Sequence, residues 1–155
     1  MDDAGVVTGV APGAGQVQAF AGSLASARVV LNVLTRADTL ALVGDSVVTV
    51  APGVTASAPL VVQVQSFSEP TPLANRPVVY TVTSPPDAGT RSVELPGGVL
   101  VDTVLTGSEG INQSVTLNRV AGVPSPDTAI VQVRSYRAGG ADVPGSGQRF
   151  IVLFQ

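Results

Sequence analysis

Short alternating runs of valine and polar residues, most of them closed by glycine or proline, dominate this sequence. In the run PLVVQVQSF (59–67), Leu60, Val62 and Val64 occupy every second position. Successive side chains of a β-strand point to opposite faces, so this spacing predicts a strand with one apolar face. The chain has 17 glycines and 12 prolines to supply turns, and no window shows sustained helical periodicity. The sequence therefore predicts an all-β fold.

The alternating pattern repeats along the chain after residue 38. Turn signals recur about every ten residues, which is typical of a β-sandwich with Greek-key connections. The periodicity places Val78, Tyr80 and Val82 on one inward face, and it does the same for the pairs Val115 and Leu117, and Val131 and Val133. The predicted strands lie at 39–44, 46–53, 59–67, 78–84, 91–106 (as two strands around Pro96–Gly98), 113–120, 128–136 and 148–154.

Residues 1–36 are expected to form a separate unit. The runs GQVQAFAG (15–22) and SARVVLNVL (26–34) alternate, and the link GSLAS (22–26) predicts the loop of an antiparallel hairpin. A lone hairpin is marginally stable in water, so its apolar face needs a cover. The following domain and a second copy of the chain are the alternatives. TRAD (35–38) predicts a hinge, and we place the two domains at 1–36 and 37–155.

The glycine-rich stretch GVVTGVAPGAGQ (5–16) raises the question of a phosphate-binding loop. Such a loop requires a lysine and leads into a helix, but this chain has no lysine and the stretch precedes an expected strand. The dinucleotide-binding spacing also fails, because Gln18 stands where its third glycine belongs. We interpret these glycines as turn residues that supply positive φ angles.

The composition excludes several classes of function. Charged residues make up 12% of the chain, the net charge is −3, and eight scattered arginines form no basic patch for nucleic acid. No apolar run approaches the roughly 20 residues that span a bilayer, which predicts no membrane insertion by this segment. With neither cysteine nor histidine, the chain lacks thiolate metal ligands and the commonest general base. We therefore expect no enzyme, no catalytic residue and no cofactor.

Residues 5–33, GVVTGVAPGAGQVQAFAGSLASARVVLNV, resemble the C-terminal half of the group 2 bacterial immunoglobulin-like domain. That resemblance implies either a piece of a longer protein or a divergent unit. Residues 37–155 are similar to invasin-type, group 1 domains, on PLVVQVQSF, the proline-rich loop and RPVVYTVTS, with Tyr80 in place of the usual tryptophan. The expected architecture is an immunoglobulin-like β-sandwich, preceded by a β-hairpin from a partial domain of the same type.

The resemblance also implies a role and a location. We expect a non-enzymatic module of a bacterial cell-surface or secreted protein, which acts as a stalk, as a spacer or as part of an adhesin. Its partners would be neighbouring immunoglobulin-like domains in a longer chain. The alternatives are a module that binds a glycan or a host protein directly, and an accessory domain of a secreted hydrolase.

Few side chains stand out as ligand candidates. Asp102 and Glu109 are the pair that we would assign to calcium, which takes oxygen ligands from loops, although no D-x-D-x-D run is present. Tyr136 shares a strand face with Gln132 and Arg134, which predicts an outward position and makes it the candidate for ligand binding. The other aromatic residues are expected to lie mostly in the core.

Overall fold

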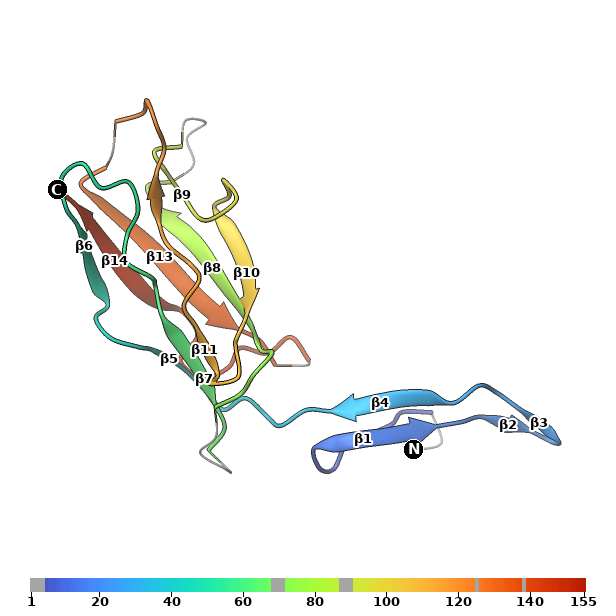
Figure 1. Cartoon of the computed structure of the whole chain (residues 1–155). Helices are drawn as coiled ribbons and strands as arrows, with labels where there is room; N and C mark the ends of the chain where they lie inside the picture. Colours follow the sequence, from blue (N-terminus) through green and yellow to red (C-terminus); the bar gives the residue numbers. More distant parts are fainter. Residues whose placement is uncertain (1–4, 68–71, 87–90, 125, 138) are drawn as a thin grey trace. The chain divides into compact units, whose positions relative to one another are not determined.

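The computed structural model describes residues 5–67, 72–86, 91–124, 126–137 and 139–155. Every regular element among these residues is a β-strand, which confirms the all-β fold class. The chain divides into two compact units, Met1–Arg36 and Ala37–Gln155. Figure 1 shows both units, with the first in blue and the second in colours from cyan to red.

The first unit is a β-hairpin. Strand β1 (Gly13–Val17) pairs antiparallel with β4 (Val29–Val33), and the short strands β2 (Phe20–Ala21) and β3 (Leu24–Ala25) form the tip. The loop between β2 and β3 holds two residues, Gly22 and Ser23, so the predicted five-residue loop is too long. Gly22 has a φ of 61°, and a two-residue hairpin turn needs a positive φ at its first position.

The ladder of the hairpin is interrupted beside Ser26. The register changes from Val17↔Val29 to Phe20↔Ala25, so the second strand carries one extra residue there, as in a β-bulge. The Ser26 backbone N–H donates to the Ala19 carbonyl at 2.9 Å, and the Ser26 hydroxyl accepts from the Ala19 N–H at 3.0 Å. A side chain therefore replaces the ladder bond that the bulge removes.

The second unit is built from strands in two facing sheets. The larger sheet has the order β10-β8-β13-β14-β6, and the smaller has the order β11-β7-β5. All pairs within these sheets are antiparallel except β14 with β6, which is parallel. A separate pair, β12 with β9, is antiparallel. The strands are β5 (Thr39–Leu42), β6 (Val47–Val50), β7 (Val62–Gln65), β8 (Pro77–Ser84), β9 (Val93–Glu94), β10 (Val101–Leu105), β11 (Ile111–Asn112), β12 (Asn118–Arg119), β13 (Thr128–Ser135) and β14 (Gln148–Phe154).

One apolar core lies between the two sheets of this unit, as expected for a β-sandwich. The predicted inward faces are confirmed, because Val62 and Val64 from the smaller sheet and Val131 and Val133 from the larger are fully buried. Tyr80 is also fully buried, and its hydroxyl donates to the Leu60 carbonyl at 3.0 Å. This hydrogen bond connects β8 of the larger sheet to the segment that leads into β7. Figure 1 labels both strands.

The predicted strand at 113–120 is wrong in detail. The chain forms β11 and β12 with an irregular segment between them, although Val115 and Leu117 are buried as expected. The Ser57 hydroxyl accepts a hydrogen bond from the Leu117 N–H at 2.9 Å. The Asn112 side chain accepts one from the Ser114 N–H at 3.2 Å. Side chains thus satisfy backbone groups that a continuous ladder would use.

Asn112, the asparagine of an Asn-Gln-Ser glycosylation sequon, is 5% exposed.

The buried phenol of Tyr80 predicts a loss of stability at high pH. Burial, and secondarily the nearby Asp102 carboxylate, raise the pKa of Tyr80 far above its ordinary value. The unfolded chain releases this proton near pH ~10 while the folded chain keeps it, so folding stability is unaffected below that pH and falls above it. We expect a decrease of about 1.4 kcal/mol per pH unit above pH ~10, measured by urea unfolding. The Tyr80→Phe variant should lack this component, and an equal slope in both proteins would contradict the assignment.

Candidate functional site

A polar cluster joins three segments at one end of the second unit. The cluster consists of Asp38, Ser66, Phe67 and Arg137, and we call it the Asp38 cluster. Asp38 lies just before β5, Ser66 and Phe67 follow β7, and Arg137 follows β13. One carboxylate oxygen of Asp38 lies 3.5 Å from the Arg137 guanidinium, and the other accepts hydrogen bonds from the Ser66 hydroxyl and the Phe67 N–H, both at 3.2 Å.

Partial burial strengthens the Asp38 cluster. The side chains of Asp38 and Arg137 are 13% and 28% exposed, and an ion pair out of bulk water is screened less than one at the surface. The Arg137 Nε also donates to the Ala37 carbonyl at 2.9 Å. The Asp38 backbone N–H donates to the Gln65 carbonyl at 2.9 Å. The first residues of the second unit are therefore held by side-chain and backbone bonds together.

The connection between β13 and β14 packs against the same segment. The Leu40 N–H donates to the Pro144 carbonyl at 2.8 Å, and the Gln148 side chain donates to the Leu40 carbonyl at 3.1 Å. Gly145 has a φ of 89°, and a Cβ at this position would overlap the Leu40 carbonyl oxygen. Glycine is therefore required there both for its backbone angle and for the close approach of β5.

Tyr136 lies at the surface beside this connection, as its place on the strand predicts. It is 37% exposed, and it forms an isolated bridge with Asp142. Arg134 lies 3.7 Å from the Asp142 carboxylate. A side-chain hydrogen bond with Tyr136 and, to a smaller extent, attraction by Asp142 raise the pKa of Arg134. Tyr136 thus belongs to an exposed group that offers an aromatic face, a cation and a carboxylate.

Of the five aromatic side chains other than Tyr136, three lie in the core, so the expectation that they lie mostly there holds, with two exceptions. Tyr80, Phe150 and Phe154 are buried, but Phe20 and Phe67 are each 71% exposed and Tyr136 is partly exposed. Phe67 follows a strand whose inward residues are Val62 and Val64, so its own side chain falls on the outer face. The alternation of residues 59–67 carries that signal. Nothing in the sequence indicates that Asp38 and Arg137 meet.

The two calcium candidates occupy different elements. Asp102 lies on β10, where it is the register partner of Tyr80. Glu109 lies in the turn before β11, and its backbone carbonyl accepts a hydrogen bond from the Gln63 side chain at 3.2 Å. Among the residues that the structure describes, no three acidic, histidine or cysteine side chains gather as metal ligands would. Asp102 instead places a charge toward the core side of a strand at the edge of the sheet, a feature that discourages edge pairing.

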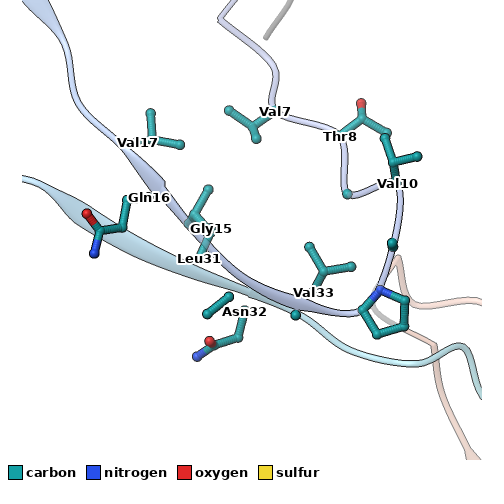
Figure 2. A pocket seen from close by; sticks show the side chains of 14 residues that line it. Val7, Thr8, Val10, Gly15, Gln16, Val17, Leu31, Asn32 and Val33 are labelled. Atoms are coloured by element: carbon teal, nitrogen blue, oxygen red, sulfur yellow. The ribbon is translucent and has the colours of Figure 1, made fainter.

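The glycine-rich stretch of residues 5–16 borders an open groove in the first unit. The groove is lined by residues 7–17 and 31–33, none of which is charged. Figure 2 shows Val7 and Val10 on the side of the strands toward which Val33 points, while Gln16 and Asn32 project to the other side. A Cβ at Gly9 would lie 2.6 Å from a methyl carbon of Val33, so the absence of a side chain lets the segment approach β4. The lining offers no cation for a phosphate group.

No family model matches the chain, and no curated protein matches it. None of the described residues belongs to a helix long and apolar enough to cross a bilayer.

Proposed function

We propose that this chain is a non-enzymatic, immunoglobulin-like module of a bacterial cell-surface or secreted protein, and that it acts as a stalk, as a spacer or as part of an adhesin. The observation that carries the proposal is the division into two all-β units joined in tandem, of which the second fastens its own first residues through the Asp38 cluster. Two units in tandem, with the first residues of the second unit held in place, suit a protein that keeps other domains at a distance.

The order of strands supports an immunoglobulin-like assignment for the second unit. In immunoglobulin domains one sheet contains strands C, F and G and the other contains A, B and E. Here β8, β13 and β14 are consecutive in the larger sheet, and β5, β7 and β11 form the smaller one. The chain enters the smaller sheet with β5 and ends in the larger sheet with β14, which is compatible with that topology.

The joint supports the spacer role. Strand β4 ends at Val33, and the second unit begins at Ala37, so residues 34–36 connect the units. The Asp38 cluster, together with the contact of Leu40 with Pro144, keeps the residues after this connection on the second unit. A short linker bounds the distance between the two chain ends that it joins.

A specific observation favours a second candidate, a module that binds a glycan or a host protein directly. Phe67 and Tyr136 are both exposed, and both belong to segments that meet at the Asp38 cluster. Exposed aromatic rings are the usual stacking partners of sugars and frequent anchors of protein interfaces. They lie at one end of the second unit, where loops gather.

Binding of the whole chain to an immobilised panel of glycans and extracellular-matrix proteins separates the two candidates. The spacer role predicts no saturable binding, with or without calcium. The binding role predicts saturable binding to one member, weakened at least about tenfold by Phe67→Ala or Tyr136→Ala, because each change removes an exposed ring. Phe20→Ala is the matched control, since Phe20 is equally exposed but belongs to the first unit. Saturable binding lost with Phe67 or Tyr136 but retained in the control would overturn the spacer proposal.

A further inference from the structure

The first and last residues of the second unit lie at opposite ends of its sandwich. Asp38, just before β5, pairs with Arg137, which follows the end of β13. The Phe154 N–H, at the end of β14, donates to the carbonyl of Asp127, which directly precedes β13. Strand β13 has eight residues, so these two places are about 25 Å apart along the strand direction. Figure 1 shows the C-terminus at the end of this unit away from the start of β5.

Tension between these two ends would pull β6 and β14 in opposite directions. Strand β6 follows β5 after residues 43–46, so a pull on the first residues of the unit draws β6 toward its own start. A pull on the last residue draws β14 toward its own end. The two strands are parallel, with a register from Ile151↔Val47 to Phe154↔Val50. The opposed pulls therefore slide one strand along the other.

The hydrogen bonds of this ladder are arranged to resist sliding. The Ile151 N–H donates to the Ser46 carbonyl at 2.8 Å at one limit of the ladder, and the Gln155 N–H donates to the Val50 carbonyl at 3.0 Å at the other. Bonds in a parallel pair are evenly spaced along the strands. A force along the strands loads them together, whereas a force across the strands opens them one after another from one end.

Side chains keep the end of β14 in place while the ladder is loaded. Val50, Val152 and Phe154 are buried in the core, so neither strand can lift away without exposing apolar surface. The Arg119 guanidinium lies 4.9 Å from the centre of the Phe154 ring and donates to the Gln155 carbonyl at 3.0 Å. The last residues are thus held by β12 as well as by β6.

We propose that the β6–β14 ladder is a shear clamp, which keeps the second unit folded while tension acts between its two ends. The inference rests on the proposed role as a stalk, spacer or part of an adhesin, since such a role exposes a module to tension. The resistance comes from the direction of the load. Forced unfolding is governed by the rate of unfolding, so the clamp acts on this rate and leaves the equilibrium stability unchanged.

Single-molecule pulling of the whole chain tests the clamp. The natural chain has no cysteine, so introduced cysteines define where the two handles attach. Gln155→Cys supplies one handle in every molecule. Leu34→Cys, which is 64% exposed and precedes the second unit, supplies the other. In this geometry the tension loads the β5–β7 ladder as well as the β6–β14 ladder.

Two further attachment points serve as matched controls. Asp45→Cys lies at an exposed position between β5 and β6, so a pull from it bypasses β5 but still slides β6 along β14. Val54→Cys is 46% exposed and lies beyond the end of β6, so a pull between it and Gln155→Cys opens the ladder from one end. The unfolding forces from Leu34 and Asp45 should both exceed the force from Val54 at least about twofold, because the ladder bonds break together only in the first two geometries.

Two results would overturn the clamp. A force from Asp45 as low as that from Val54 would place the resistance in the β5–β7 ladder. Equal forces from all three attachment points would show that the direction of the load has no effect. Urea unfolding of the three variants verifies that their equilibrium stabilities agree. The panel of glycans and matrix proteins tests the spacer role separately, so saturable binding there would reject that role without changing the ratio of forces.

Discussion

Replacement of Tyr80 by alanine is expected to destabilise the second unit by about 3–5 kcal/mol. The side chain is fully buried between the two sheets, so its removal leaves a cavity that the surrounding strands cannot close without moving. The change also removes the hydroxyl that donates to the Leu60 carbonyl at 3.0 Å, which leaves a buried acceptor without its donor. A loss of this size approaches the whole stability of many domains.

Urea unfolding followed by circular dichroism measures this loss of stability. One further variant separates the hydrogen bond from the packing of the ring, and another serves as a control. Tyr80→Phe keeps the ring and removes the hydrogen bond, and we expect a loss of about 1–2 kcal/mol. Tyr136→Ala changes the same residue type at an exposed position, and we expect a change within about 0.5 kcal/mol. A similar loss for Tyr80→Ala and Tyr136→Ala would contradict the placement of Tyr80 in the core.

Replacement of Gly145 by alanine is the second change with a large expected effect, a loss of about 2–4 kcal/mol. Part of the loss comes from the backbone, because Gly145 has a φ of 89°, which residues with a Cβ rarely adopt. The larger part comes from overlap of the new methyl group with the Leu40 carbonyl oxygen. The segment after Val143 must then move away from β5 and lose the hydrogen bond between Leu40 and Pro144.

Gly147→Ala separates these two causes. Gly147 has a φ of 93°, close to that of Gly145, but a Cβ there would come no closer than 3.9 Å to another group. We expect a loss of about 1 kcal/mol from the backbone alone. Hydrogen exchange of the Leu40 N–H should accelerate in Gly145→Ala and remain slow in Gly147→Ala. Equal losses of stability in the two variants would show that the close approach of β5 contributes nothing.

The period of two in the sequence was sufficient to predict which faces are buried. Val62, Val64, Val131 and Val133 lie in the core because alternation is a local property of an extended chain, whatever strand lies beside it. The same pattern placed Tyr136 at the surface. It also places Phe67 on the outer face of its strand, where the side chain is 71% exposed.

Contacts between residues far apart in the sequence could not be predicted from local sequence patterns. The parallel pairing of β6 with β14 joins residues about one hundred positions apart, and no periodicity indicates it. The irregular segment between β11 and β12 depends on Ser57. Its hydroxyl accepts a hydrogen bond from the Leu117 backbone N–H, 60 residues later in the chain. The alternation of residues 113–120 predicts one strand because it contains no information about this competing acceptor.

The residues of the candidate site were likewise predicted only in part from the sequence. Sequence identified Tyr136 as an outward residue, but it did not connect Asp38 with Arg137, or either of them with Phe67. These contacts depend on the close approach of β5, β7 and the connection after β13, which only the packing of the two sheets establishes. The sequence by itself determined the strand class and the apolar faces, because both follow from a repeat of two residues. Tertiary structure alone decided which strands and side chains meet, because those contacts join segments that are far apart in the chain.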